Sequence, residues 1–143
     1  MSAPKLEPGQ SLADCPATKE FRERHEQVAR AAEEHAAQRQ HAKGKGTARE
    51  RIDQLLDNGS FLEVGQFSGS GVGANAKPSG VVTGFGTIDG RQVAVYSQDF
   101  SVQGGSLGSV EGDKIVRLLD DALRLRIPII GLIDSGGAKI QEG

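Results

Sequence analysis

The spacing of apolar residues changes several times along the chain, and each spacing predicts a different element. Residues 16–42 carry few apolar positions among Glu, Arg, Gln and Ala, which predicts a helix with a thin apolar stripe. Residues 81–88 and 92–98 have the pattern of strands, and Asp89-Gly90 between them is a strong hairpin signal. Apolar residues recur at three- and four-residue spacing over residues 109–126, which predicts an amphipathic helix.

Two further segments decide the fold class. Thr47-Ala-Arg-Glu50 has the form of a capping box, so we predict a short helix that begins there and ends at Asn58-Gly59 in a left-handed C-cap. Residues 127–133 are almost continuously aliphatic, which is typical of a parallel strand covered on both faces. A strand, a crossover helix and a second strand make a βαβ unit, so the predicted fold class is α/β.

Glycine is abundant and concentrated in predicted loops. The chain has 20 glycines in 143 residues, about twice the usual share. We predict one Gly-rich loop at residues 68–79, after a strand at residues 61–67, and a second at residues 99–108. The polar residues 1–15 are predicted to form a disordered tail.

Composition and charge exclude several classes of function. The formal net charge of −2 gives no indication of a nucleic-acid partner or an anionic membrane surface. The longest aliphatic run is too short to span a bilayer, and the first residues lack the apolar core of a signal peptide. A single cysteine, Cys15, and three histidines without i,i+4 spacing give no metal site. We therefore expect a cytoplasmic protein with no metal, no nucleic acid and no membrane.

The segment after the aliphatic strand is the strongest candidate for chemistry. In a parallel sheet, ligands bind beyond the carboxyl ends of the strands. Gly136-Gly137 would let backbone N–H groups approach a ligand oxygen there, as in an oxyanion hole. A tight turn without a ligand explains the spacing equally well. Residues 104–108 precede the amphipathic helix in the same way, and there a plain loop is the simpler interpretation.

The remaining polar residues offer no obvious side-chain nucleophile or base. No serine lies in a G-x-S-x-G elbow. Asp99 and Asp134 lie near loop ends, and we interpret them as braces of those loops rather than as catalytic groups. An enzyme built on this chain would therefore act through backbone donors.

Four motifs together resemble the propionyl-CoA carboxylase β family, the carboxyltransferase subunits of biotin-dependent acyl-CoA carboxylases. They are TARERIDQLLDNGSF at residues 47–61, GVVTGFGTIDG at residues 80–90, SQDFSVQGGSLG at residues 97–108 and SGGAKIQEG at residues 135–143. No single motif is specific, but four in this order are. The resemblance begins near Phe21 and extends to the end of the chain.

The resemblance implies an incomplete crotonase-type (ClpP/crotonase) fold of ββα units preceded by an N-terminal helix. Residues 43–143 would then be the start of the N-terminal, acyl-CoA-binding carboxyltransferase domain, and residues 16–42 the preceding helix. Family chains are several times longer, and the second oxyanion donor and the carboxybiotin-binding half lie in their remainder. We therefore expect this chain to be inactive by itself.

The resemblance also implies a reaction and its partners. The family subunit moves the carboxyl group from carboxybiotin to the α-carbon of an acyl-CoA, such as propionyl-CoA or acetyl-CoA. Backbone N–H donors hold the thioester enolate that forms. Biotin is carried by a biotin carboxylase/biotin carrier α subunit, and it is the base after it loses CO₂, so no catalytic His or Cys is needed. The family β subunits form a hexamer.

Site residues follow from the resemblance by position. Gly136, Gly137 and Ala138 match the loop that supplies one side of the oxyanion hole, and which of their N–H groups is the donor is left open. Lys139 stands where the family usually has Arg, which loses any bidentate contact. The substrate-binding residues implied in the same way are Gly104, Gly105, Ser106, Leu107, Gly108 and Lys139.

Two other interpretations are compatible with parts of the sequence. The first is another crotonase-fold enzyme, a CoA hydratase or isomerase, against which the motif at residues 47–61 and the N-terminal helix argue. The second is a non-catalytic truncated subunit that acts as an interaction module through the helix at residues 16–42.

Overall fold

The computed structural model describes residues 15–70 and 77–140 of the chain. Contacts divide the chain into two units, residues 1–34 and residues 35–143, and each is described by itself. The tail predicted at residues 1–15 lies outside the described residues except for Cys15, and so do residues 71–76 of the first predicted Gly-rich loop. The domain boundaries given by the resemblance stay predictions.

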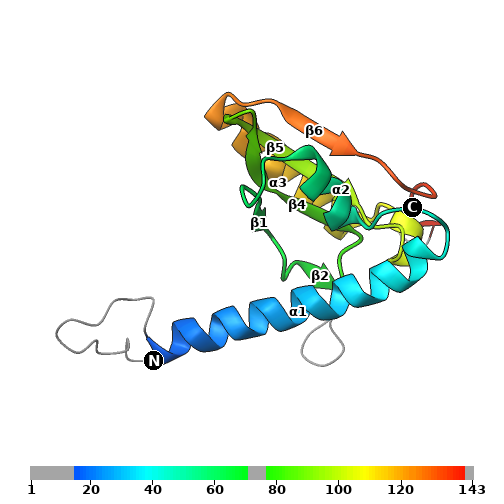
Figure 1. The fold of residues 1–143 in the computed structure, drawn as a ribbon. Coiled ribbons are helices and arrows are strands. Elements are labelled where there is room, and N and C mark those ends of the chain that lie inside the picture. Colours follow the sequence, from blue (N-terminus) through cyan, green and yellow to red (C-terminus); the bar gives the residue numbers. More distant parts are fainter. Residues whose placement is uncertain (1–14, 71–76, 141–143) are drawn as a thin grey trace. The chain divides into compact units, whose positions relative to one another are not determined.

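The helix predicted at residues 16–42 is confirmed as α1 (Pro16–His41), which begins in the first unit and ends in the second (Figure 1). Within the second unit, Ala36 and Gln40 on the last turns of α1 are buried. Arg39 Nη1 donates to the carbonyl oxygen of Ser101 at 3.1 Å. The end of α1 is therefore anchored to the loop at residues 99–108.

The second helix, α2 (Ala48–Leu55), begins as predicted and ends earlier than predicted. The Glu50 N–H donates to Thr47 Oγ1 at 3.1 Å and the Thr47 N–H donates to Glu50 Oε2 at 2.8 Å, which confirms the capping box. The predicted left-handed C-cap at Asn58-Gly59 is wrong, because Leu56 already has extended backbone. Leu56 is buried in the core, and the Asp57 N–H donates to the Thr87 carbonyl oxygen, so tertiary contacts end the helix first.

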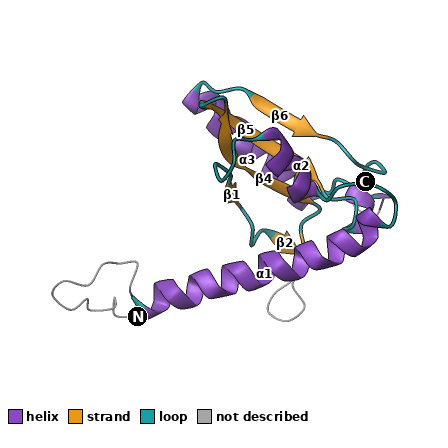
Figure 2. Ribbon diagram, in the orientation of Figure 1, coloured by secondary structure: helices purple, strands orange, loops and turns teal. Residues whose placement is uncertain are grey.

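The main sheet has four strands in the order β1-β4-β5-β6: β1 (Leu62–Val64), β4 (Val81–Ile88), β5 (Arg91–Gln98) and β6 (Ile129–Leu132) (Figure 2). The predicted hairpin is confirmed, since β4 and β5 are antiparallel and Asp89 and Gly90 between them both have positive φ. The strand predicted at residues 61–67 shortens to the three residues of β1. The predicted loop after it contains a second, two-stranded sheet of β2 (Gly69–Ser70) and β3 (Lys77–Pro78).

The predicted βαβ unit is confirmed by the parallel pairing of β5 with β6, which runs from Ala94↔Ile129 to Ser97↔Leu132. The crossover helix is α3 (Ser109–Leu125). It ends at Arg126, which adopts left-handed backbone, two residues before Pro128. The carboxyl ends of β5 and β6 therefore lie at the same edge of the sheet.

Helices α2 and α3 cover opposite faces of the main sheet. The first core cluster joins Ile52 of α2 to Val93 and Val95 of β5, and the second joins Leu118 of α3 to Ala94. Alternate residues of β5 thus enter alternate cores, as the period of a strand requires. The buried residues of both clusters are aliphatic, and the aromatic Phe61, Phe85 and Tyr96 pack against them from partly buried positions.

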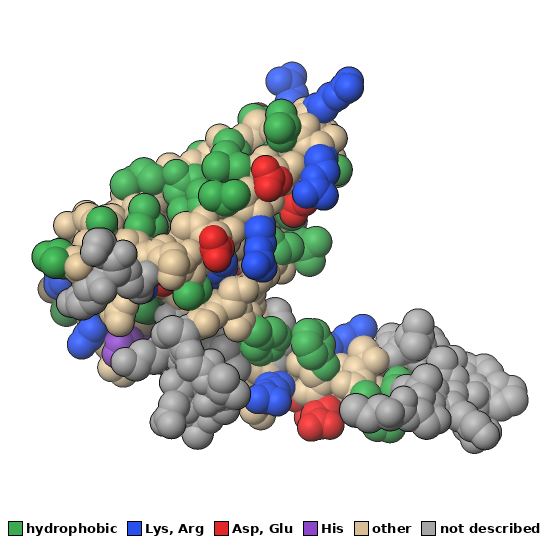
Figure 3. Space-filling view, turned by 180° about the vertical axis from the view of Figure 1, so that it is seen from behind, with side chains coloured by type: hydrophobic (Ala, Val, Ile, Leu, Met, Phe, Trp, Pro, Cys, Tyr) green, Lys and Arg blue, Asp and Glu red, His purple; other side chains and the backbone are tan. Residues whose placement is uncertain are grey.

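The outer parts of the second unit keep apolar side chains at the surface. β6 is one of the two edge strands of the main sheet, and its residues are half-buried or exposed rather than covered on both faces as predicted. Figure 3 shows hydrophobic side chains gathered on one face of the molecule; on α3, Val116, Leu119 and Leu123 are exposed. Among the described residues, no helix combines the length and apolar character that a bilayer span requires.

Candidate functional site

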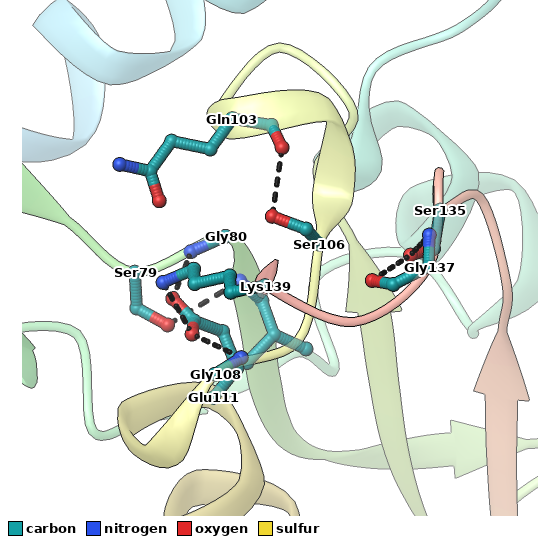
Figure 4. A network of polar contacts seen from close by, with 10 residues as sticks. Ser79, Gly80, Gln103, Ser106, Gly108, Glu111, Ser135, Gly137 and Lys139 are labelled. Atoms are coloured by element: carbon teal, nitrogen blue, oxygen red, sulfur yellow. Dashed lines mark hydrogen bonds and ion pairs between the residues drawn. The ribbon is translucent and has the colours of Figure 1, made fainter. Parts of the chain in front are cut away.

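The two Gly-rich segments that follow β5 and β6 pair with each other (Figure 4). We call residues 99–108 and 133–139 the paired glycine loops. Leu107 and Ala138 form a parallel bridge, in which the Leu107 N–H donates to the Gly137 carbonyl oxygen at 3.0 Å and the Lys139 N–H donates to the Leu107 carbonyl oxygen at 2.8 Å. The structure thus brings together the two segments that the sequence analysis named separately.

A further bond and a close approach hold the other end of the paired glycine loops. The Gly136 N–H donates to the Gly104 carbonyl oxygen at 2.9 Å. Gly105 has a φ of +64°, and a Cβ built on it would lie 2.3 Å from the carbonyl oxygen of Asp134. A side chain at residue 105 would therefore separate the loops as well as strain the backbone.

Hydrogen bonding divides the three predicted oxyanion donors into two classes. The Gly136 N–H is bound to Gly104, and the Gly137 N–H donates to Ser135 Oγ at 3.0 Å. The Ala138 N–H has no acceptor among the described residues. In a parallel bridge, Leu107 bonds with the two residues that flank its partner, so the Ala138 N–H points away from Leu107. Of the three, Ala138 is the one whose N–H the described residues leave unbonded.

The predicted substrate residue Lys139 is held inside the protein. Its side chain is 15% exposed, and its ammonium lies 2.8 Å from Glu111 Oε2. Glu111 also accepts the Gly80 N–H at 3.1 Å and the Gly108 N–H at 3.0 Å. The contact of Lys139 with substrate stays a prediction, and its observed partner is a carboxylate that the sequence analysis did not single out.

Glu111 is ionised although it is buried. Burial opposes ionisation, but the hydrogen bond from Lys139 and the N–H groups of Gly80 and Gly108 outweigh it and hold the pKa of the carboxyl below its usual value. The signal in the sequence is local, because Glu111 is the third residue after Gly108 and its carboxylate caps the N-terminus of α3. Its link to Lys139, by contrast, joins residues 28 positions apart.

Asp99 and Asp134, near the starts of the paired glycine loops, are braces in the structure. Asp99 Oδ1 accepts from both the backbone N–H and the hydroxyl of Ser101. Asp134 Oδ1 lies 3.0 Å from Lys45 Nζ. Both carboxylates are thus engaged in holding the loops.

Positive charge lies beside the first of the paired glycine loops. Lys43 Nζ and Lys45 Nζ lie 4.8 and 5.3 Å from the centre of the Phe100 ring. The guanidinium of Arg39 reaches the carbonyl oxygen of Ser101 in the same loop. All three cationic side chains belong to exposed residues. Lys45 is paired with Asp134, so the charge that favours an anionic ligand at this edge of the loops comes from Arg39 and Lys43.

Comparison with known proteins identifies the family. Residues 39–143 match the carboxyl transferase domain. The chain belongs to the carboxyl transferase domain family. The predicted resemblance to propionyl-CoA carboxylase β subunits is confirmed by the similarity to the propionyl-CoA carboxylase beta chain of Saccharopolyspora erythraea. That relative is 54% identical over 129 residues, which cover 86% of this chain and 23% of the relative.

Proteins with other names are also similar to this chain. The methylmalonyl-CoA decarboxylase subunit alpha of Veillonella parvula is 49% identical over 115 residues, which cover 76% of this chain and 23% of that subunit. The crystal structure of transcarboxylase 12S with hydrolysed methylmalonyl-coenzyme A bound superposes with a TM-score of 0.78 and 39% identity over 96% of this chain and 28% of that chain.

These similarities confirm the α/β class and the incomplete crotonase-type fold. The chain spans about a quarter of the length of the relatives that it matches.

Proposed function

We propose that this chain is part of the carboxyltransferase subunit of a biotin-dependent acyl-CoA carboxylase. The subunit moves a carboxyl group from carboxybiotin, the carboxyl donor carried by a partner, to the α-carbon of an acyl-CoA such as propionyl-CoA or acetyl-CoA. Support comes from the family and from the relative in Saccharopolyspora erythraea. The family match argues against a hydratase, an isomerase or a mere interaction module.

The observation that carries the proposal is the Ala138 N–H, which has no acceptor in the part of the chain that the structure describes. Removing a proton from the α-carbon of a thioester places negative charge on the carbonyl oxygen. A fixed backbone donor aimed at that oxygen stabilises the transition state more than the substrate. Gly136 and Gly137 then shape the loop, and Ala138 donates.

The charge beside the paired glycine loops supports a CoA ester. Arg39, Lys43 and Lys45 lie at the first loop, and a CoA ester carries a diphosphate and a further phosphate. In this proposal residues 104–108 line the acyl-CoA site. Residues 43–143 belong to the acyl-CoA-binding domain.

Partners and assembly follow from the same proposal. The carboxyl donor arrives on a biotin carboxylase/biotin carrier α subunit, and the β subunits form a hexamer in the cytoplasm. Transcarboxylase 12S is described as a hexamer assembly, and beta5 relatives in Mycobacterium are named as biotin-dependent acetyl-/propionyl-coenzyme A carboxylase subunits.

A second candidate is the reverse direction of transfer, since a methylmalonyl-CoA decarboxylase subunit is 49% identical. The same enolate forms when a malonyl-type thioester loses its carboxyl group, so the paired glycine loops serve both directions. This candidate differs from the carboxylase in the substrate that is consumed, but the Ala138 N–H would donate to the enolate oxygen in both.

The test is an isotope assay with a complete subunit that carries this sequence, assembled with its biotin-carrying partner. With propionyl-CoA, ATP and radioactive bicarbonate, we expect acid-stable label in the acyl-CoA product. Biotin-dependent loss of label from methylmalonyl-CoA without net fixation would favour the decarboxylase. Hydration of an enoyl-CoA without either activity would contradict the proposal.

A further inference from the structure

Glu111 is the point where three separate segments of the second unit meet. Its Oε1 accepts from the Gly80 N–H, just before β4, and its Oε2 accepts from the Gly108 N–H, at the end of the first of the paired glycine loops. The third donor is the ammonium of Lys139, in the second loop. Figure 4 shows these groups converging on one carboxylate.

We infer that Glu111 and Lys139 are positioning residues that set the spacing of the paired glycine loops and so fix the direction of the Ala138 N–H. The inference rests on the proposed function for its catalytic consequence, but not for its structural basis. Neither residue needs to touch the substrate.

The contacts of Lys139 explain how the pair acts on Ala138. Lys139 directly follows Ala138, and it is fixed at both ends, since its N–H donates to the Leu107 carbonyl oxygen and its side chain reaches Glu111. Ala138 is therefore held between two residues, Gly137 and Lys139, that both bond with Leu107. Releasing the side chain of Lys139 loosens the bond that orients the neighbouring peptide group.

The burial of the pair makes its geometry sensitive to charge. The Glu111 side chain is 3% exposed, and a buried carboxylate is stable only while its donors stay in place. Glu111→Gln removes the charge, and the NH₂ group of glutamine cannot accept from any of the three donors. We therefore expect that the side chain of residue 111 can no longer satisfy Gly80, Gly108 and Lys139 together.

The hairpin side of the sheet supplies a matched control. Asp57 also accepts three hydrogen bonds, from the Thr87 hydroxyl and the backbone N–H groups of Asp89 and Gly90. It contacts none of the paired glycine loops in these bonds. Asp57→Asn therefore makes the same kind of chemical change at a site that serves only folding.

The kinetic experiment measures kcat and KM for the acyl-CoA in the assembled carboxylase. We expect Glu111→Gln to lower kcat about 10- to 100-fold with less than about a threefold change in KM, since misplacing a donor affects mainly the transition state. Lys139→Met gives the same pattern, and Lys139→Arg recovers most of the lost kcat. Asp57→Asn leaves kcat within about twofold. If Glu111→Gln does not fold, the kcat of Lys139→Met tests the inference in its place.

An independent experiment needs no activity. Amide hydrogen exchange at Leu107 and Lys139, measured by NMR on this chain, should speed at least about tenfold in Glu111→Gln and stay unchanged in Asp57→Asn. Unchanged exchange, or unchanged kcat in a folded Glu111→Gln enzyme, would overturn the inference. A wild-type enzyme that transfers no carboxyl group contradicts the proposed function instead, and the exchange rates still decide whether Glu111 holds the loops.

Discussion

Asp57 and Glu111 each accept three hydrogen bonds, yet they hold together different kinds of structure. Asp57 joins the end of α2 to the β4–β5 hairpin, on the side of the sheet that α2 covers. Glu111 joins the start of β4 to both of the paired glycine loops. One carboxylate supports a tight turn made of regular elements, and the other supports two loops with little regular structure of their own.

The two regions differ in how many other interactions hold them when the carboxylate is removed. The hairpin is also specified by eight residue pairs between β4 and β5 and by its turn, so it has many independent supports. Among the described residues, the paired glycine loops are joined to each other by one bridge, one further backbone bond and the Glu111 cluster. We expect a single change to disturb the loops more than the hairpin.

Replacing each of two glycines of positive φ with alanine should give the largest difference in the free energy of unfolding. At Gly105 a Cβ would lie 2.3 Å from the Asp134 carbonyl oxygen, whereas at Gly90 a Cβ would meet nothing within 4 Å. Gly105→Ala should therefore lower the free energy of unfolding by about 3 kcal/mol or more, through overpacking and strain. Gly90→Ala should cost about 1 kcal/mol, through strain alone. Urea denaturation of the two variants measures both, and equal losses would contradict the close approach of the loops.

A buried lysine on α3, Lys114, should make the free energy of unfolding depend on pH. Burial lowers the pKa of Lys114 from 10.5 to about 8, against the opposing effect of Glu63. Arg49 and Glu111 also face it, the first lowering its pKa further and the second raising it. Its Nζ donates to the Val81 carbonyl oxygen at 2.6 Å.

A lysine with a lowered pKa weakens folding while it is protonated, and this penalty is lost as the pH rises from about 8 to about 10.5. Over that range the free energy of unfolding should rise by up to about 3 kcal/mol relative to the variant Lys114→Met. Urea denaturation of both proteins at several pH values measures the difference. Parallel curves would show that Lys114 is not buried as a charge.

Removing the capping box should give the smallest effect and leave the loops intact. Thr47→Ala deletes the hydroxyl that accepts the Glu50 N–H, which should cost about 1 kcal/mol. Amide exchange at Leu107 and Lys139 should not change, because their N–H groups donate to the carbonyl oxygens of Gly137 and Leu107, which lie in the paired glycine loops and not in α2. Faster exchange at these two amides would mean that the two regions are coupled.

The success of the sequence predictions depends on how far apart in the sequence the interacting residues lie. The capping box and the Asp89-Gly90 turn join residues within a few positions, and both predictions are confirmed. The end of α2 was mispredicted, because burial of Leu56 and the Asp57 bonds across the sheet override the local signal of Asn58-Gly59.

The candidate site needed contacts between distant residues. The sequence pointed to both glycine loops and to Ala138, but the pairing of Leu107 with Ala138 depends on the parallel register of β5 and β6. For the same reason no pattern indicated that Lys139 would find Glu111. The choice of Ala138 over Gly136 and Gly137 required their hydrogen bonds.

The most direct test of the account compares Ala138→Pro with Ala138→Gly in the assembled carboxylase. Proline removes an N–H that has no acceptor among the described residues, and glycine keeps it. We predict that Ala138→Pro folds but loses about 100- to 1,000-fold in kcat, as expected for the loss of one oxyanion donor, while Ala138→Gly stays within a few-fold of wild type. A folded Ala138→Pro enzyme with unchanged kcat would contradict the assignment of Ala138 as the donor.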